Sequence, residues 1–85
     1  MKKGYMIVDS CWTFYALIRE GVFTNKNDAL KRAEELAIKR AMEWTHRNNE
    51  LWKEEAEVKR KGDEFWIYHK GNSNLFGVVE VDLHE

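Results

Sequence analysis

The apolar residues of this 85-residue chain fall into short runs near both ends and into a longer helical pattern between them. Segments 5–9 and 11–19 carry apolar and aromatic runs that stop at turn-forming residues, which is typical of strands. Segment 22–24 predicts a short extension or a separate strand. Near the C-terminus, segments 64–69 (EFWIYH) and 75–84 (LFGVVEVDLH) predict two more strands, joined by the turn sequence KGNSN.

The central pattern predicts one long amphipathic helix from about residue 25 to residue 46. Thr24 or Asn25 can accept hydrogen bonds from the first free backbone amides, and Asp28 suits the positive end of the helix. The segment is dense in strong helix formers. Its apolar stripe, at steps of three and four, consists of Leu30, Ala33, Ala37, Ala41 and Trp44.

Residues 47–61 allow two interpretations. We favour a helix that continues to about residue 60, because LWKEEAEVKR is compatible with helix. The alternative is a strand at 56–61 that pairs with 64–69 across a turn at Gly62. A helix that long would span about 50 Å at 1.5 Å per residue, whereas the strands reach about 20–30 Å. Leu51 and Trp52 would then project past the sheet.

Together these elements predict an α+β fold within a single globular domain, residues 1–85. The order is ββ(β)αββ: an antiparallel sheet of about four strands with the helix packed on one face. In the last strand, Val79, Val81 and Leu83 alternate with Glu80 and Asp82. That alternation is typical of an antiparallel sheet with one solvated face. Periodicity alone does not decide which sheet face meets the helix.

The strand at 64–69 breaks this alternation, because both of its faces are large and apolar. Phe65 and Ile67 would lie on one face, and Trp66 and Tyr68 on the other. One helix cannot cover both faces, so the sequence predicts an aromatic interaction surface. Its hypothetical residues are Trp12, Tyr15, Trp52, Trp66 and Tyr68, with a charged rim of Lys59, Arg60, Lys61, Glu54 and Glu57. The alternative is that the rings lie flat on the sheet under lysine and arginine stems.

Candidate chemistry is sparse. His46, His69 and His84 show no metal-ligand spacing with each other or with Cys11. A histidine could approach Cys11 across the sheet, but a small buried residue near a turn is the simpler interpretation. No glycine-rich phosphate loop is present. The sequence therefore predicts no enzyme, no metal and no cofactor.

Composition limits the expected cellular compartment and the expected class of partner. A lone cysteine cannot form an internal disulfide, which favours a reducing cytoplasm. No run approaches the roughly 20 apolar residues of a membrane span. The net charge of −1 makes nucleic acid an unlikely partner.

These observations predict a small protein-binding domain that regulates or inhibits a macromolecular partner. In size and composition the chain is similar to small phage-encoded anti-defence proteins, a similarity that covers no motif. A protein partner is expected, and a homodimer is the expected way of covering the second sheet face. Two other classes stay open: a small-ligand-binding protein with an aromatic pocket between helix and sheet or at a dimer seam, and a nucleic-acid-binding module.

Overall fold

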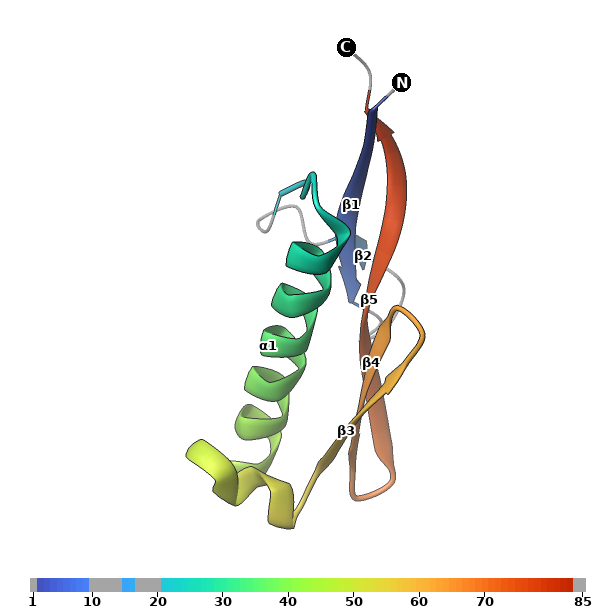
Figure 1. Ribbon diagram of the computed structural model, residues 1–85. Helices are drawn as coiled ribbons and strands as arrows, with labels where there is room; N and C mark the ends of the chain where they lie inside the picture. The colour runs from blue at the N-terminus through green and yellow to red at the C-terminus, as the bar shows by residue number, and fades with distance from the viewer. Residues whose placement is uncertain (1, 10–14, 17–20, 84–85) are drawn as a thin grey trace.

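The computed structural model describes residues 2–9, 15–16 and 21–83, and shows one antiparallel sheet with one long helix across it (Figure 1). The strand order is β2-β1-β5-β4-β3. This confirms the predicted α+β class. The elements are β1 (Lys2–Asp9), β2 (Tyr15–Ala16), α1 (Lys26–Thr45), η2, a 3-10 helix (Asn49–Glu54), β3 (Glu57–Lys61), β4 (Glu64–His69) and β5 (Asn72–Leu83).

Helix α1 begins and ends where the sequence predicts, to within one residue. The side chain of Asn25 accepts hydrogen bonds from the backbone nitrogens of Asn27 at 2.8 Å and Asp28 at 3.3 Å. These bonds satisfy two of the amides that have no partner inside the helix. At the other end, His46 adopts a left-handed backbone (φ 56°) and its N–H bonds to the carbonyl of Met42. That conformation stops the helix.

The predicted apolar stripe of α1 faces the sheet. Its alanines are fully buried, and they let the helix backbone approach the strands closely. The large side chains of the core come mainly from the sheet. The buried cluster consists of Ile7, Ala29, Leu30, Ala33, Ala37, Ala41, Trp52, Ala56, Phe65, Ile67, Phe76 and Val78, with Trp44 packed against it.

The favoured extension of α1 to residue 60 is wrong, and the alternative strand is confirmed. After His46 the chain turns back through η2 and enters β3, which pairs with β4 across Gly62. Trp52 therefore does not project past the sheet: it is 6% exposed and belongs to the core. Leu51 beside it is 52% exposed. Burying a tryptophan removes a large apolar area from water, which a straight helix could not have done.

Both turns of the C-terminal meander are two-residue hairpin turns. Gly62 has φ 62° at the first turn position between β3 and β4, as a type II′ turn requires. Lys70 (φ 49°) and Gly71 (φ 81°) are both left-handed between β4 and β5, as in a type I′ turn. The predicted KGNSN turn is therefore tighter than expected, and β5 begins at Asn72.

The two predicted N-terminal elements at 11–19 and 22–24 are only partly described. Tyr15 and Ala16 form β2, which pairs with the end of β1. Residues 10–14 and 17–20 lie outside the described residues. Phe23 forms a two-hydrogen-bond bridge with Tyr5, with both N···O distances at 2.8 Å.

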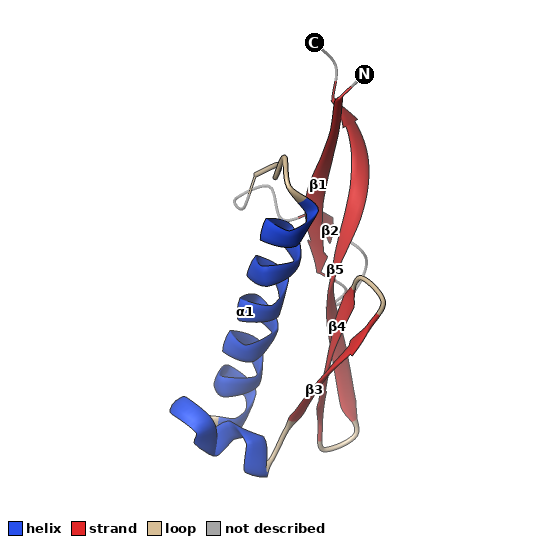
Figure 2. Ribbon diagram, viewed as in Figure 1, coloured by secondary structure: helices blue, strands red, loops and turns tan. Residues whose placement is uncertain are grey.

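Strands β1 and β5 continue beyond the N-terminal end of α1 as a two-stranded ribbon (Figure 2). There the ammonium of Lys3 lies 2.6 Å from Asp82 and 3.4 Å from Glu80. The hydrogen bond to Asp82 is the main cause that raises the pKa of Lys3. Exposed pairs of this kind contribute little to stability.

A partly buried polar cluster ties the helix to the sheet. The guanidinium of Arg40 donates to Asp9 at 3.0 Å and to Asn74 at 3.2 Å. It also lies 4.9 Å from the centroid of the Phe76 ring. One helix side chain thus contacts two neighbouring strands, β1 and the central strand β5.

We expect Ala37→Glu to destabilise the protein strongly, because Ala37 is fully buried against the sheet. Burying an unpaired carboxylate costs several kcal/mol, or about 3 to 5 on the scale of broken buried pairs. Urea unfolding would measure the loss. Lys39→Glu, on the exposed side of the same helix, is the matched control and should change stability by less than about 1 kcal/mol. Equal effects of both substitutions would contradict the assigned helix face.

We expect Arg40 and Asp9 to be energetically coupled. A double-mutant cycle with Arg40→Ala and Asp9→Ala should give about 1–3 kcal/mol, since the pair is partly buried and shares further contacts. The exposed pair Arg32–Glu35, at 3.2 Å, serves as the control and should give about 0.3–0.5 kcal/mol. A cycle that is additive for Arg40 and Asp9 would rule out this cross-layer role.

Candidate functional site

Strand β4 places its four apolar residues on two different faces of the sheet. Phe65 and Ile67 lie beneath the helix and are 2% and 0% exposed. Trp66 and Tyr68 lie on the opposite face and are partly exposed. We call this opposite side, over β3, β4 and β5, the helix-free face. It is the part of the described structure that best matches the aromatic surface predicted from the sequence.

Trp66 and Tyr68 form an ordered pair on the helix-free face. Their rings are nearly parallel, at 14°, with centroids 6.2 Å apart. The ammonium of Lys61 lies 5.3 Å and 5.6 Å from the two ring centroids and 3.0 Å from the Tyr68 hydroxyl. The indole N–H of Trp66 donates to Glu64 at 3.2 Å.

These contacts combine the two interpretations that the sequence left open. The aromatic pair is present, and a lysine stem and a glutamate partly cover it. Both polar atoms of the rings have partners within the chain, and the Lys61 side chain lies over both rings, so the pair exposes less apolar area than bare rings would. These contacts also fix the position of both rings within the chain itself.

On the helix-free face, small and apolar residues continue from this pair toward β1. Leu75, which pairs with Trp66 across the strands, is 3% exposed. Gly77 lies beside it, and a side chain there would bring a Cβ within 3.3 Å of Val8. Farther along β5, Val79 is 41% exposed. The side chains at the centre of this face are therefore apolar and buried, and the apolar side chain farther along β5 is more exposed to solvent.

The predicted charged rim divides between the two sides of the sheet. Lys59 and Lys61 lie on the helix-free face with Glu57, whose carboxylate is 3.5 Å from the Lys59 ammonium. Arg60 lies on the helix side instead, 5.6 Å from the Phe65 ring centroid, and donates to the carbonyl of Gly62 at 2.9 Å. It therefore does not join the aromatic pair.

Of the other predicted surface residues, Glu54 lies apart at the end of η2. Trp52 is buried in the core, so its predicted place on the aromatic surface is wrong. Trp12 lies outside the described residues, and for Tyr15 the structure describes only the strand pairing. Sequence reasoning missed Glu64 and Leu75. Glu64 could have been found, because it is two residues from Trp66 in a strand and must share its face.

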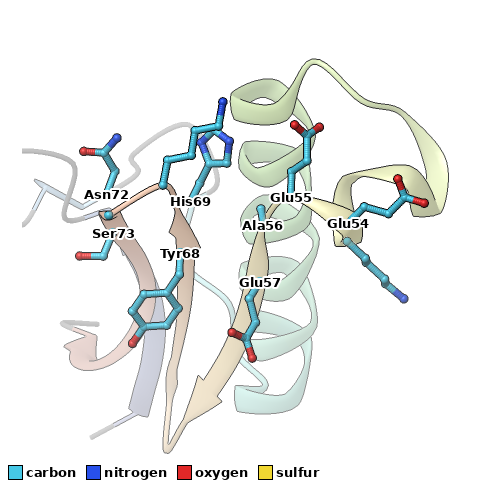
Figure 3. Close-up of a pocket in the computed structure, with 11 residues that line it drawn as sticks. Glu54, Glu55, Ala56, Glu57, Tyr68, His69, Asn72 and Ser73 are labelled. Carbon is cyan, nitrogen blue, oxygen red and sulfur yellow. The ribbon is translucent and has the colours of Figure 1, made fainter.

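An open polar groove of about 420 Å³ runs between the start of β3 and the β4–β5 turn (Figure 3). Glu54, Glu55 and Glu57 line one side, and their carboxylates point in three different directions. Glu55 is bound to Arg47 at 3.0 Å. This arrangement holds no pair of carboxylates positioned for acid–base catalysis.

His69 lies at the inner end of this groove, with its ring centroid 6.4 Å from that of Trp44. Its Nε2 is buried and makes no hydrogen bond within the described part of the chain. No set of three His, Cys, Asp or Glu side chains able to hold a metal occurs among the described residues. Cys11 and His84 lie outside them.

No helix among the described residues is long and apolar enough to cross a membrane. Comparisons with protein-family models, with curated proteins and with solved structures gave no match.

We expect truncations along β4 to alternate in their cost. Ile67→Ala should lower the free energy of unfolding by about 2–5 kcal/mol, because it leaves a cavity in the core. Tyr68→Ala, on the helix-free face, should cost less than half as much as Ile67→Ala in the same measurement, because the Tyr68 ring is only partly buried. Urea unfolding of both variants tests this. A larger loss for Tyr68→Ala would show that its ring supports the fold rather than the surface.

Proposed function

We propose that this chain is a small protein-binding domain, without catalytic activity of its own, that regulates or inhibits a macromolecular partner. Its contact surface is the helix-free face of β3 and β4. The observation that carries the proposal is the fixed pair of Trp66 and Tyr68, partly exposed and flanked by Lys59 and Lys61. Tryptophan and tyrosine are the residue types most enriched at binding hot spots.

The pair is suited to binding because its geometry is set in advance. Lys61 holds the hydroxyl of Tyr68, and Glu64 holds the indole N–H of Trp66. Ordering side chains on association costs about 0.5–1.5 kcal/mol for each flexible side chain. Rings that are already ordered avoid much of this cost.

The charges on this face favour a protein over a nucleic acid. Lys59 and Lys61 are accompanied by Glu57 and Glu64 on the same side of the sheet. A phosphate backbone would be attracted by the lysines and repelled by the glutamates, whereas a protein surface of mixed charge can match both.

The small-ligand alternative has less support. Large side chains from the sheet fill most of the space under α1. A hollow of about 230 Å³ lies between α1 and the β3–β4 hairpin, but its lining is mainly polar and charged, with Phe65 as an aromatic member. The groove beside β3 is open and lined mainly by charged and polar residues, with the rings of Tyr68 and His69 among them. Drug-sized ligands generally bind in enclosed and mainly apolar pockets.

The proposed setting is the cytoplasm, where a lone cysteine stays reduced. The similarity in size and composition to phage-encoded anti-defence proteins fits a role as an inhibitor of a host protein.

We expect Trp66→Ala to abolish specific capture of the partner from a lysate of the native host. Tyr68→Ala should weaken capture at least tenfold, because both rings belong to one contact. Leu51→Ala, which removes an exposed apolar side chain on η2, is the control and should leave capture unchanged. Quantitative mass spectrometry of the three captures, with thermal melting of each variant, gives the comparison.

Two results would overturn the proposal. One is retention of the same partner by both aromatic variants. The other is binding of single-stranded DNA that falls steeply with salt and depends on Lys59 and Lys61, which would identify a nucleic-acid module instead.

A further inference from the structure

Strand β3 forms one outer edge of the sheet. It pairs with β4 on its inner side. On its outer side, no backbone hydrogen bond to β3 occurs in the described part of the chain. We propose that a second copy of this chain pairs with this edge, antiparallel, with the twofold axis at Val58. This inference goes beyond the proposed function and does not depend on it.

The hairpin turn determines which backbone groups of β3 face outward. Residues 61 and 64 flank the two-residue turn, so they form a hydrogen-bonded pair. In an antiparallel ladder such pairs alternate, so Lys59 and Glu57 also bond inward to β4. The N–H and C=O groups of Val58 and Arg60 therefore point outward. They are the groups that a second strand would pair with.

Lysine on an edge strand usually discourages pairing, but β3 changes sign along its length. Its sequence is EVKRK, with Glu57 at the start and Lys59 and Lys61 farther on. With the axis at Val58, Glu57 of each copy lies opposite Lys59 of the other, and the two Val58 side chains meet. The two ion pairs form without placing like charges directly opposite each other.

Other registers of β3 with itself are worse. With the axis at Lys59, the two Lys59 side chains lie directly opposite each other. With the axis at Arg60, Arg60 faces Arg60 and Lys59 faces Lys61. A parallel pair in register places every charge beside its own copy. Of these registers, the one centred on Val58 pairs Glu57 with Lys59 twice and places no two like charges of β3 directly opposite each other.

A second stretch of free edge is less suitable. Strand β5 continues past its last pair with β4, at Gly77. Its residues Glu80 and Asp82 lie there, and self-pairing centred on Val81 or Glu80 would bring acidic side chains together. Pairing of this stretch with β3 of another copy would not close, and would produce an open chain of molecules.

The proposed dimer leaves room for both helices. A twofold axis perpendicular to the sheet keeps both copies of α1 on the same side. Because α1 lies mainly over β4 and β5, the two helices would be separated by about four strand spacings, or about 19 Å. Helix diameters of about 10 Å fit within that distance. On the other side, the Trp66 and Tyr68 pairs of both copies share one continuous face.

The test is a set of charge reversals measured by sedimentation equilibrium, from micromolar to millimolar protein. We expect a weak dimer, since one short strand edge buries a small area. Glu57→Lys and Lys59→Glu should each raise the dissociation constant at least tenfold, because each places like charges opposite one another in two symmetric pairs. The double variant Glu57→Lys/Lys59→Glu should return it to near the wild-type value.

Glu34→Lys and Lys39→Glu, on the exposed side of α1, are the controls and should leave the dissociation constant unchanged. Thermal melting shows whether each variant is folded. A monomer at every concentration overturns the proposal, as does a dimer that tolerates the single reversals or is not restored by the double one. Open-ended oligomers would also overturn it, in favour of contact between β3 and β5.

Cross-linking tests the register separately, in a Cys11→Ser background. Residues 57 and 59 of opposite copies would form a non-hydrogen-bonded pair with Cα atoms about 4.5 Å apart, within reach of a disulfide. Mixing Glu57→Cys with Lys59→Cys should therefore give a disulfide-linked dimer on mild oxidation. Lys59→Cys alone should stay largely uncross-linked. Efficient cross-linking of Lys59→Cys alone would show an axis at residue 59 and refute the Val58 register.

Discussion

The close contact between the alanine stripe of α1 and one sheet face is the constraint on which the rest of this structure depends. Ala33, Ala37 and Ala41 are fully buried, so the helix backbone can lie near the strands. The volume between helix and sheet is then filled by side chains of the sheet, such as Ile7 and Ile67. A single helix packed in this way covers one face only. The other face must be stabilised by its own side chains.

Two features hold this packing in register. Arg40 reaches across the layers to Asp9 and Asn74, which joins the helix to the neighbouring strands β1 and β5. At the C-terminal end of the helix, the chain turns back and places Trp52 in the core. This turn also brings β3 alongside β4, so the burial of one tryptophan and the addition of an edge strand result from the same change of direction.

On the helix-free face, neighbouring side chains of β3 and β4 partly cover the aromatic rings. Trp66 and Tyr68 stack along one strand, and Lys61 and Glu64 satisfy their polar atoms. The face is consequently less exposed than an unpartnered aromatic surface would be, but it stays ordered and accessible. It adjoins the open edge of β3, so the surface proposed for a partner and the edge proposed for a second copy are neighbours on one part of the molecule.

Local signals in the sequence were sufficient for the elements whose ends are fixed by local chemistry. The Asn25 cap, the alanine period and the alternation of Phe65 with Trp66 each depend on neighbours a few residues away. Residues 47–61 were different, because LWKEEAEVKR is compatible with helix and its strand half is stabilised only by pairing with β4. The burial of Trp52 and the separation of Arg60 from its neighbouring lysines likewise depend on contacts distant in sequence. Only the tertiary structure could decide them, since the free energy of those contacts outweighs helix propensity.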